Sequence, residues 1–192
     1  MKALALILAL ALVPVAVNSH LRNVYRQTLA HWLSKIVPPP SIFIGDSIMT
    51  GGMWFDNLRN INLASNGLIT DQIAGNLKLA QAYRPKRIVI MAGMNDALRG
   101  FDPDKLRSLW VAICKEPAII VTLIPPTKHD ELNRKIDEIN RIILESVNGR
   151  RVIKLDVADE SGRIKTEFAA DGIHIGPKAY EQWTAKLRAA AI

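Results

Sequence analysis

Acyl transfer to a hydroxyl requires a nucleophile, an imidazole base, a carboxylate that orients the base and N–H donors for an oxyanion. The sequence offers these parts in four places, which are Ser47, Gly67, Asn95 and the pair Asp171 and His174. Each residue alone also has an ordinary structural explanation, such as a turn glycine or a loop polar residue. Together they supply what acyl transfer requires, provided that folding brings them to one place.

The segment that carries Ser47 begins as a short apolar run, Ser41 to Ile44, and breaks at Gly45. This pattern predicts a buried strand that runs into a turn. Gly51 and Gly52 then leave the backbone free to re-enter a helix. A serine at the end of a first parallel strand lies where open α/β sheets place their ligand sites.

Strands alternate with helices over the rest of the chain. Apolar runs predict strands at 41–45, 61–64, 87–92, 118–124 and 152–157, and helical spacing predicts helices at 71–83, 103–113, 130–147 and 177–190. Five alternating strands imply one parallel sheet covered by helices on both faces, which is a three-layer α/β/α fold of the flavodoxin-like type. The residues that follow the strands, including all four candidate segments, should therefore gather at one edge of the sheet.

The four segments in this order resemble the SGNH (GDSL-like) hydrolase superfamily. The match comprises Gly45-Asp46-Ser47, Gly67, Gly93-x-Asn95-Asp96 and Asp171-x-x-His174, and it spans about residues 41–190. One such block would be weak evidence, whereas four in order, each after the expected strand, are specific.

This resemblance implies a role for each residue. Ser47 would be the nucleophile, His174 the base, and Asp171 the carboxylate that fixes the imidazole. The oxyanion hole would comprise the backbone N–H groups of Ser47 and Gly67 and the side-chain amide of Asn95. No metal and no cofactor is expected.

The second block departs from the commoner family form. It reads Ser65-Asn66-Gly67-Leu68-Ile69-Thr70-Asp71, where relatives often have another glycine a few residues after the first. We expect Thr70 to cap the following helix. Asp46 and Asp96 are expected to brace their turns, without a part in the chemistry.

The substrate class stays open between two resemblances. Asn95-Asp-Ala-Leu-Arg-Gly100 is similar to the thioesterase/lysophospholipase branch, which indicates lipid-like acyl esters or thioesters, whereas the segment 171–180 is similar to carbohydrate O-deacetylases. Fold and triad do not choose between them. The predicted substrate-binding residues are Met94, Trp54 and His129, and Met49, Met53 and Phe101 are further candidates to line a pocket.

Three regions are expected along the chain. Residues 1–19 contain fifteen uncharged residues, Ala3 to Val17, and predict a signal peptide or membrane anchor, with a tolerable cleavage site near Ser19. Residues 20–40 form an amphipathic helix and a Pro-rich linker, and the helix either lies on a membrane surface or packs on the domain. Residues 41–192 form the hydrolase domain. The protein is therefore expected to be exported (periplasmic or secreted) or membrane-anchored.

The charge and composition of the chain favour some classes of binding partner over others. The net charge is +7, and no Asp or Glu precedes Asp46. The basic residues form no dense stripe typical of nucleic-acid binding, so anionic lipid or acidic glycan is the better expectation. The single cysteine, Cys114, is expected to be a buried core thiol, and no His, Cys, Asp or Glu cluster has metal-ligand spacing. The oligomeric state is left open.

Two other classes compete with the esterase. The first is a non-catalytic, membrane-attached module with the same fold that assists envelope polysaccharide assembly, and the intact set of catalytic residues argues against it. The second is a nucleotide-binding α/β protein. It lacks support, because the sequence contains neither Gly-x-Gly-x-x-Gly nor a phosphate-loop lysine motif.

Overall fold

The structure of the chain is a computed structural model. The structure describes residues 19–52, 60–149 and 151–190, with side chains from Gln27 onward. Residues 1–18 and 53–59, which include the expected export segment and Trp54, lie outside the described residues.

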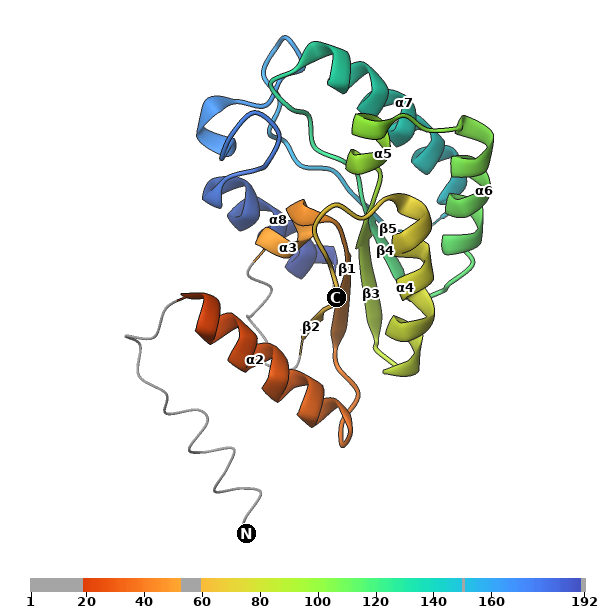
Figure 1. The fold of residues 1–192 in the computed structure, drawn as a ribbon, viewed down its shortest axis with the longest axis vertical. Helices are drawn as coiled ribbons and strands as arrows, with labels where there is room; N and C mark the ends of the chain where they lie inside the picture. The colour runs from red at the N-terminus through yellow and green to blue at the C-terminus, as the bar shows by residue number, and fades with distance from the viewer. Residues whose placement is uncertain (1–18, 53–59, 150, 191–192) are drawn as a thin grey trace.

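Five parallel strands form one sheet in the order β2-β1-β3-β4-β5 (Figure 1). This is the flavodoxin-like order. The chain adds β2 on one side of β1 and then adds β3, β4 and β5 on the other side, and all five strands run in the same direction. The strands are short, and β1, β3 and β4 are apolar and almost wholly buried, as expected for strands covered on both faces. Their bounds are β1 Ser41–Gly45, β2 Ile61–Asn62, β3 Arg87–Met91, β4 Ile119–Thr122 and β5 Arg151–Ile153.

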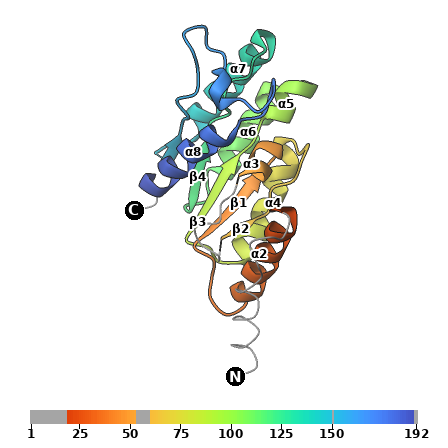
Figure 2. The ribbon, with the colours of Figure 1, turned by 90° about the vertical axis from the view of Figure 1, so that its left-hand side faces the viewer.

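Helices cover both faces of the sheet. One layer is formed by α4 (Thr70–Ala82), α6 (Pro103–Ile113) and α7 (Asp130–Ser146), which contact one another in that order. The other layer contains α8 (Pro177–Ala190) and α2 (Ser19–Ser34), which lie in front of the sheet in Figure 2. The predicted three-layer α/β/α architecture is therefore confirmed.

Three strands end at least two residues earlier than their apolar runs predict. The ladder of β4 stops at Thr122, shortly before Pro125 and Pro126, which have no N–H to donate. At the far edge, β5 is paired only as far as Ile153. In β2, the side chain of Asn62 accepts a hydrogen bond from the N–H of Ala64 at 3.0 Å, and beyond the ladder the N–H groups of Leu63 and Ser65 still donate to β1 at 2.8 Å and 3.1 Å.

The helix α2 packs on the domain through part of its length. Leu29 and Ala30 are buried, and the side-chain oxygen of Gln27 accepts a hydrogen bond from the N–H of Asn62 at 2.9 Å. Gln27 thereby satisfies a donor of the edge strand β2, which would otherwise be open to pairing with another chain. His31 bonds the hydroxyl of Tyr83 at 2.7 Å, beyond the end of α4.

Cys114 is buried, as predicted for a core thiol. No helix in the described part of the chain is long and apolar enough to cross a membrane.

Candidate active site

Ser47 lies directly after β1, at the first position of the short helix α3 (Ser47–Gly51). Asp46 caps this helix, because its Oδ1 accepts a hydrogen bond from the N–H of Ile48 at 3.0 Å. The glycines at 51 and 52 end the helix, whereas the sequence suggested that they precede one. The cap and the helix fix the hydroxyl of Ser47 at the carboxyl edge of the sheet, where it is half-buried.

The structure brings Ser47, His174 and Asp171 together. The Oγ of Ser47 lies 3.1 Å from Nε2 of His174, and Nδ1 of the same ring lies 2.8 Å from Oδ2 of Asp171. Since a carboxylate only accepts, Nδ1 carries the proton, and Nε2 is left as the acceptor for the serine hydroxyl. The geometry is that of a nucleophile, a base and an orienting carboxylate.

Asp171 is held in its ionised form mainly by its own loop. Its Oδ1 accepts hydrogen bonds from the N–H groups of His174 and Ile173, each at 2.7 Å. The His174 N–H, then the Ile173 N–H, then the imidazole hold the pKa of Asp171 well below its usual range. A permanent negative charge therefore stands behind the ring, where it favours the imidazolium that forms when the base takes a proton.

Two N–H groups at this edge are suited to hold an oxyanion. Neither the Ser47 N–H nor the Gly67 N–H has an acceptor among the residues that the structure describes. Gly67 has a φ of +75°, a backbone conformation that favours glycine. The N–H of Ser65 donates to the carbonyl of Gly45 at 3.1 Å, which fixes the Gly67 loop against the end of β1, two residues before Ser47.

Asn95, the third expected donor, lies on the short helix α5 (Met94–Arg99) that follows β3. Its Nδ2 donates to the carbonyl of Leu68 at 3.0 Å, which leaves the second amide hydrogen for another acceptor. Arg99 also bonds this loop, because Nη2 donates to the carbonyl of Gly67 at 2.9 Å. Neither the helix α5 nor the contact of Arg99 was predicted from the sequence.

Thr70 does not cap α4, so that prediction is wrong. Thr70 is the first residue of the helix, and Oδ2 of Asp96 accepts from both its N–H at 2.9 Å and its hydroxyl at 3.0 Å. The cap position is Ile69, whose N–H donates to the side-chain oxygen of Gln72. Asp96 thus braces the Gly67 loop, as expected. It accepts a hydrogen bond from the Thr70 hydroxyl, which the capping prediction had placed at the start of α4.

These features place the chain beside known proteins. The model of the GDSL-like lipase/acylhydrolase family matches residues 43–182, which cover all four candidate segments. The chain belongs to this family. No curated protein matches it.

Solved structures share the fold of this GDSL-like protein. A GDSL-like lipase from Bacteroides thetaiotaomicron superposes with a TM-score of 0.72 at 18% identity, over 86% of this chain and 96% of that one. A lipase/acylhydrolase from Enterococcus faecalis gives 0.63 at 20% identity, over 80% and 95%. An acetyl xylan esterase from Geobacillus stearothermophilus gives 0.59 at 18% identity, over 77% and 92%. At these identities the likeness shows the fold alone.

Asp46 of the GDSL-like protein is buried without a full set of partners. The residue is 0% exposed, and its Oδ2 has no hydrogen-bond partner among the described residues. Burial, partly opposed by the Ile48 N–H and by His174, raises the pKa of Asp46 to about 6. A carboxyl group that changes charge in this range therefore lies directly beside the nucleophile.

Tyr180 is a second residue that sequence analysis missed. Its hydroxyl donates to the carbonyl of Ile48 at 2.7 Å and joins α8 to α3. Burial, followed by the charge of Asp46, raises the pKa of Tyr180. A Cβ at Gly51 would lie 2.4 Å from this hydroxyl, so the glycine permits the contact. No signal in the sequence indicated this pairing.

The predicted substrate-binding residues have different environments. Met94 is 2% exposed and belongs to the hydrophobic core, as does Met49. His129 is exposed and lies against the triad loop, because a Cβ at Gly172 would be 2.7 Å from its Nε2. Trp54 lies outside the described residues. Substrate contacts by these three stay predictions, and His129 is the best placed of the described pair.

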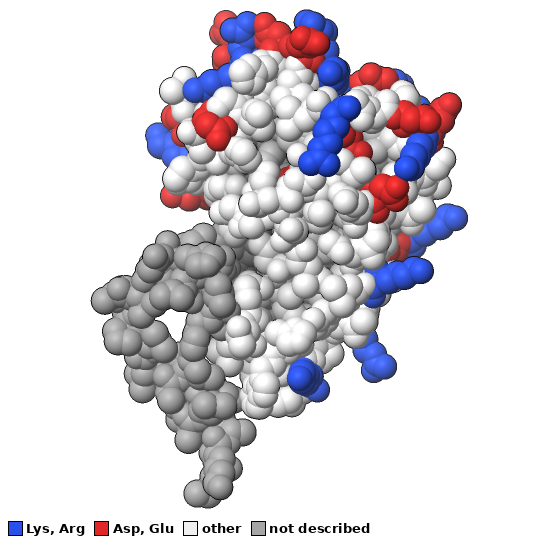
Figure 3. All heavy atoms as spheres, in the orientation of Figure 1, with Lys and Arg blue, Asp and Glu red and all other residues white. Residues whose placement is uncertain are grey.

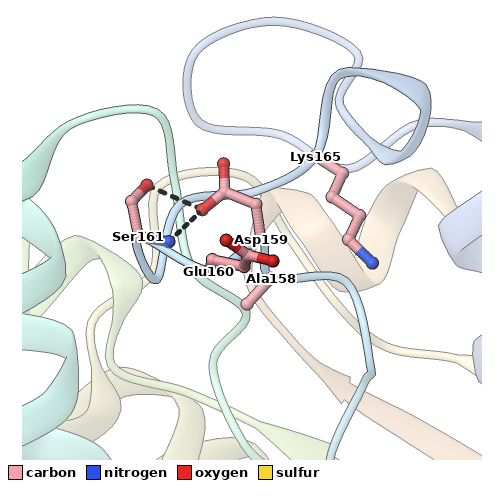
Figure 4. A pocket seen from close by; sticks show the side chains of 5 residues that line it. All are labelled: Ala158, Asp159, Glu160, Ser161 and Lys165. Atoms are coloured by element: carbon pink, nitrogen blue, oxygen red, sulfur yellow. Dashed lines mark hydrogen bonds between the residues drawn. The ribbon is translucent and has the colours of Figure 1, made fainter.

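Two hollows flank the 154–176 loop. A polar one of about 760 Å³ lies at Ala158, Asp159, Glu160, Ser161 and Lys165 (Figure 4). Its walls are set by a local turn in which Oδ1 of Asp159 accepts from the N–H and the hydroxyl of Ser161. None of the catalytic candidates lines this hollow.

The second hollow is a mostly apolar groove of about 640 Å³ beside the triad. Its lining includes Ala170 and Ile175, the immediate neighbours of Asp171 and His174 in the chain. Gly51, at the end of the helix that starts with Ser47, also lines it. In the described part of the chain, no three or more His, Cys, Asp or Glu side chains form a group suited to a metal ion.

Proposed function

We propose that this GDSL-like protein is a serine ester hydrolase that acts through an acyl-enzyme on Ser47. The observation that carries the proposal is the continuous chain of contacts from Ser47 Oγ through His174 to Asp171, at 3.1 Å and 2.8 Å. Family membership supports ester hydrolysis in general.

In the acylation step, Ser47 Oγ attacks the ester carbonyl while Nε2 of His174 takes its proton. The new imidazolium is stabilised by the ionised Asp171. The carbonyl oxygen becomes an oxyanion and accepts from the N–H groups of Ser47 and Gly67 and from the Asn95 amide. Collapse of this intermediate breaks the bond to the alcohol, and His174 returns the proton to the leaving oxygen. A water molecule then repeats the sequence on the acyl-enzyme and releases the acid.

For the substrate, we propose a carboxylic ester with a lipid-like acyl chain or an O-acetyl group on carbohydrate. The apolar groove beside the triad is the candidate site for the part of the ester that leaves on the His174 side, because Ile175 and Ala170 line it. Its volume lies within the range of small-molecule sites, which is roughly 300–1,000 Å³. A location outside the cytoplasm, by export or by an N-terminal anchor, is proposed from the uncharged run Ala3 to Val17.

The test is hydrolysis of p-nitrophenyl esters from acetate to palmitate by the wild type and by Ser47→Ala. We expect Ser47→Ala to abolish turnover while circular dichroism shows an unchanged fold, and Ser108→Ala, an exposed serine on α6, to keep full activity. Undiminished turnover by Ser47→Ala would refute the proposal. A strong preference for long chains would reject the deacetylase alternative.

Covalent labelling separates the enzyme from the non-catalytic module. An organophosphonate should modify the wild type at Ser47 and leave Ser47→Ala unlabelled, as read by mass spectrometry of the intact chain. A wild type that neither reacts with the phosphonate nor hydrolyses any ester of the series would favour the binding module.

A further inference from the structure

The edge of the sheet opposite the catalytic residues has a distinct composition. Because all five strands are parallel, the segments that enter β1, β3 and β4 lie together at the amino edge. These segments are residues 35–40, 83–86 and 114–118, and Arg87 begins β3 beside them. We define the amino-edge patch as Lys35, Ile36, Val37, Arg84, Lys86, Arg87 and Lys115.

The patch is basic and its cations are accessible. Lys35, Arg84, Lys86 and Lys115 are exposed, and none of the four is in an ion pair with any residue that the structure describes. Within the three entering segments the only carboxylate is Glu116, whose oxygens accept from the Gln81 amide and the Ala118 N–H. The amino edge is therefore strongly positive.

Acidic side chains lie toward the other end of the molecule. Figure 3 shows Asp and Glu near α5 and α7, whereas the lower end of the described surface, below α4, shows only Lys and Arg in colour. Several other cations are neutralised by carboxylates, as Lys105 is by Asp71 and Lys186 by Asp156. The asymmetry gives this chain one face suited to an anionic partner.

Two apolar side chains protrude from the same patch. Ile36 is 68% exposed and Val37 is 43% exposed, directly after the end of α2. An anionic glycan presents mainly hydroxyl and charged groups, so it has little surface that would bury an isoleucine and a valine. A bilayer with anionic headgroups accepts both kinds of group, because the cations stay at the phosphates and the apolar tips enter the acyl boundary.

We propose that the amino-edge patch docks this protein on an anionic phospholipid surface. The uncharged run Ala3 to Val17, which precedes α2, would supply the second of the two weak attachments that stable peripheral binding requires. Docking on this edge directs the catalytic edge away from the bilayer, since a five-residue parallel strand separates them by about 16 Å. This last consequence rests on the proposed function: the ester would reach Ser47 from the aqueous side.

The experiment compares two double variants of the full-length chain that change the net charge equally. Arg84→Glu with Lys86→Glu alters the patch, and Lys165→Glu with Lys178→Glu alters exposed lysines near the opposite edge. Binding is measured by flotation with vesicles of phosphatidylcholine alone and of phosphatidylcholine and phosphatidylglycerol in a two-to-one ratio. The neutral vesicles report any insertion by the N-terminal segment, which all variants share.

We expect the patch variant to lose about tenfold or more in affinity for the anionic vesicles, and the control variant to lose about twofold or less. High salt should remove the difference, and neutral vesicles should show none. Equal losses in the two variants, or no loss in either, would overturn the proposal. If the patch variant lost binding to duplex DNA but kept its binding to the anionic vesicles, the proposal would be overturned in favour of a nucleic-acid partner.

Two further measurements keep the proposal testable. Lysine acetylation of the wild type, read by mass spectrometry, should be suppressed by anionic vesicles at Lys35, Lys86 and Lys115 but not at Lys165, and uniform labelling would contradict docking on this edge. This footprint needs no variant to fold. Ser47→Ala must bind vesicles like the wild type, so a failure of hydrolysis and a failure of docking are read separately.

Discussion

Replacement of Asp46 by asparagine should change how the stability of the protein depends on pH. Asparagine keeps the oxygen that accepts from the Ile48 N–H and removes the charge. In the wild type, burial raises the pKa of Asp46 from 3.8 to about 6. The folded state therefore binds a proton more tightly than the unfolded state does over this interval.

The sign and the size follow from linkage. Well below pH 3.8 the carboxyl is protonated in both states and contributes no pH dependence. As the pH rises to about 6, the unfolded chain loses its proton first, so the free energy of unfolding of the wild type falls. The rise of the pKa from 3.8 to about 6 lowers the free energy of unfolding by about 3 kcal/mol once the carboxyl is ionised in both states.

The assay is urea unfolding of the wild type and of Asp46→Asn between about pH 3 and about pH 7. All other titrating groups are common to both chains, so the difference in unfolding free energy reports Asp46 together with its coupling to His174 and Asp96. It should shift in favour of the variant by up to about 3 kcal/mol as the pH rises. Asp102→Asn is the matched control, because Asp102 also caps a helix but is exposed to water. A difference that stays constant with pH would refute the reasoning.

Three other substitutions test the site and its support. Asp171→Asn should lower kcat at neutral pH by about three to four decades, because the imidazole loses its orienting charge, and a stopped assay on a short activated ester measures this. Asn95→Ala should lower kcat by about two to three decades with KM little changed, in the same assay, and an equal rise in KM would contradict an oxyanion donor. Gly93→Ala should lower the free energy of unfolding by at least about 2 kcal/mol more than Gly100→Ala does, as thermal melts would show. Both glycines have positive φ, but only at Gly93 would a Cβ lie within 3 Å of core side chains.

Much of the fold was predictable because its signals are local. The apolar runs at β1 and β3 and the helical spacing at α6 and α8 predict those elements within a residue at each end. The short β2 and β5 were overestimated, because pairing at a sheet edge depends on where the neighbouring strand ends. The helix α5 was missed because six residues carry too little periodicity to distinguish a helix from a loop.

The candidate site was predictable in its chemistry and unpredictable in its support. Ser47 and His174 are identified by type and motif, and their contact follows from the parallel topology. The bond from Arg99 to Gly67 and the contact of Tyr180 with α3 depend on side-chain directions that no local pattern encodes. Thr70 shows the same limit, since its hydroxyl bonds a carboxylate 26 residues away in the chain.

The parallel sheet separates two kinds of work in this protein. Residues that leave the strands converge at the carboxyl edge, so Ser47 and His174 meet although 127 residues separate them. Residues that enter the strands converge equally at the amino edge, and there they comprise cations and two exposed apolar side chains rather than catalytic groups. A surface interaction at that edge would leave the catalytic groups unobstructed, because the length of the strands lies between them. The same topology that assembles the nucleophile and the base thus makes attachment and catalysis separable by mutation.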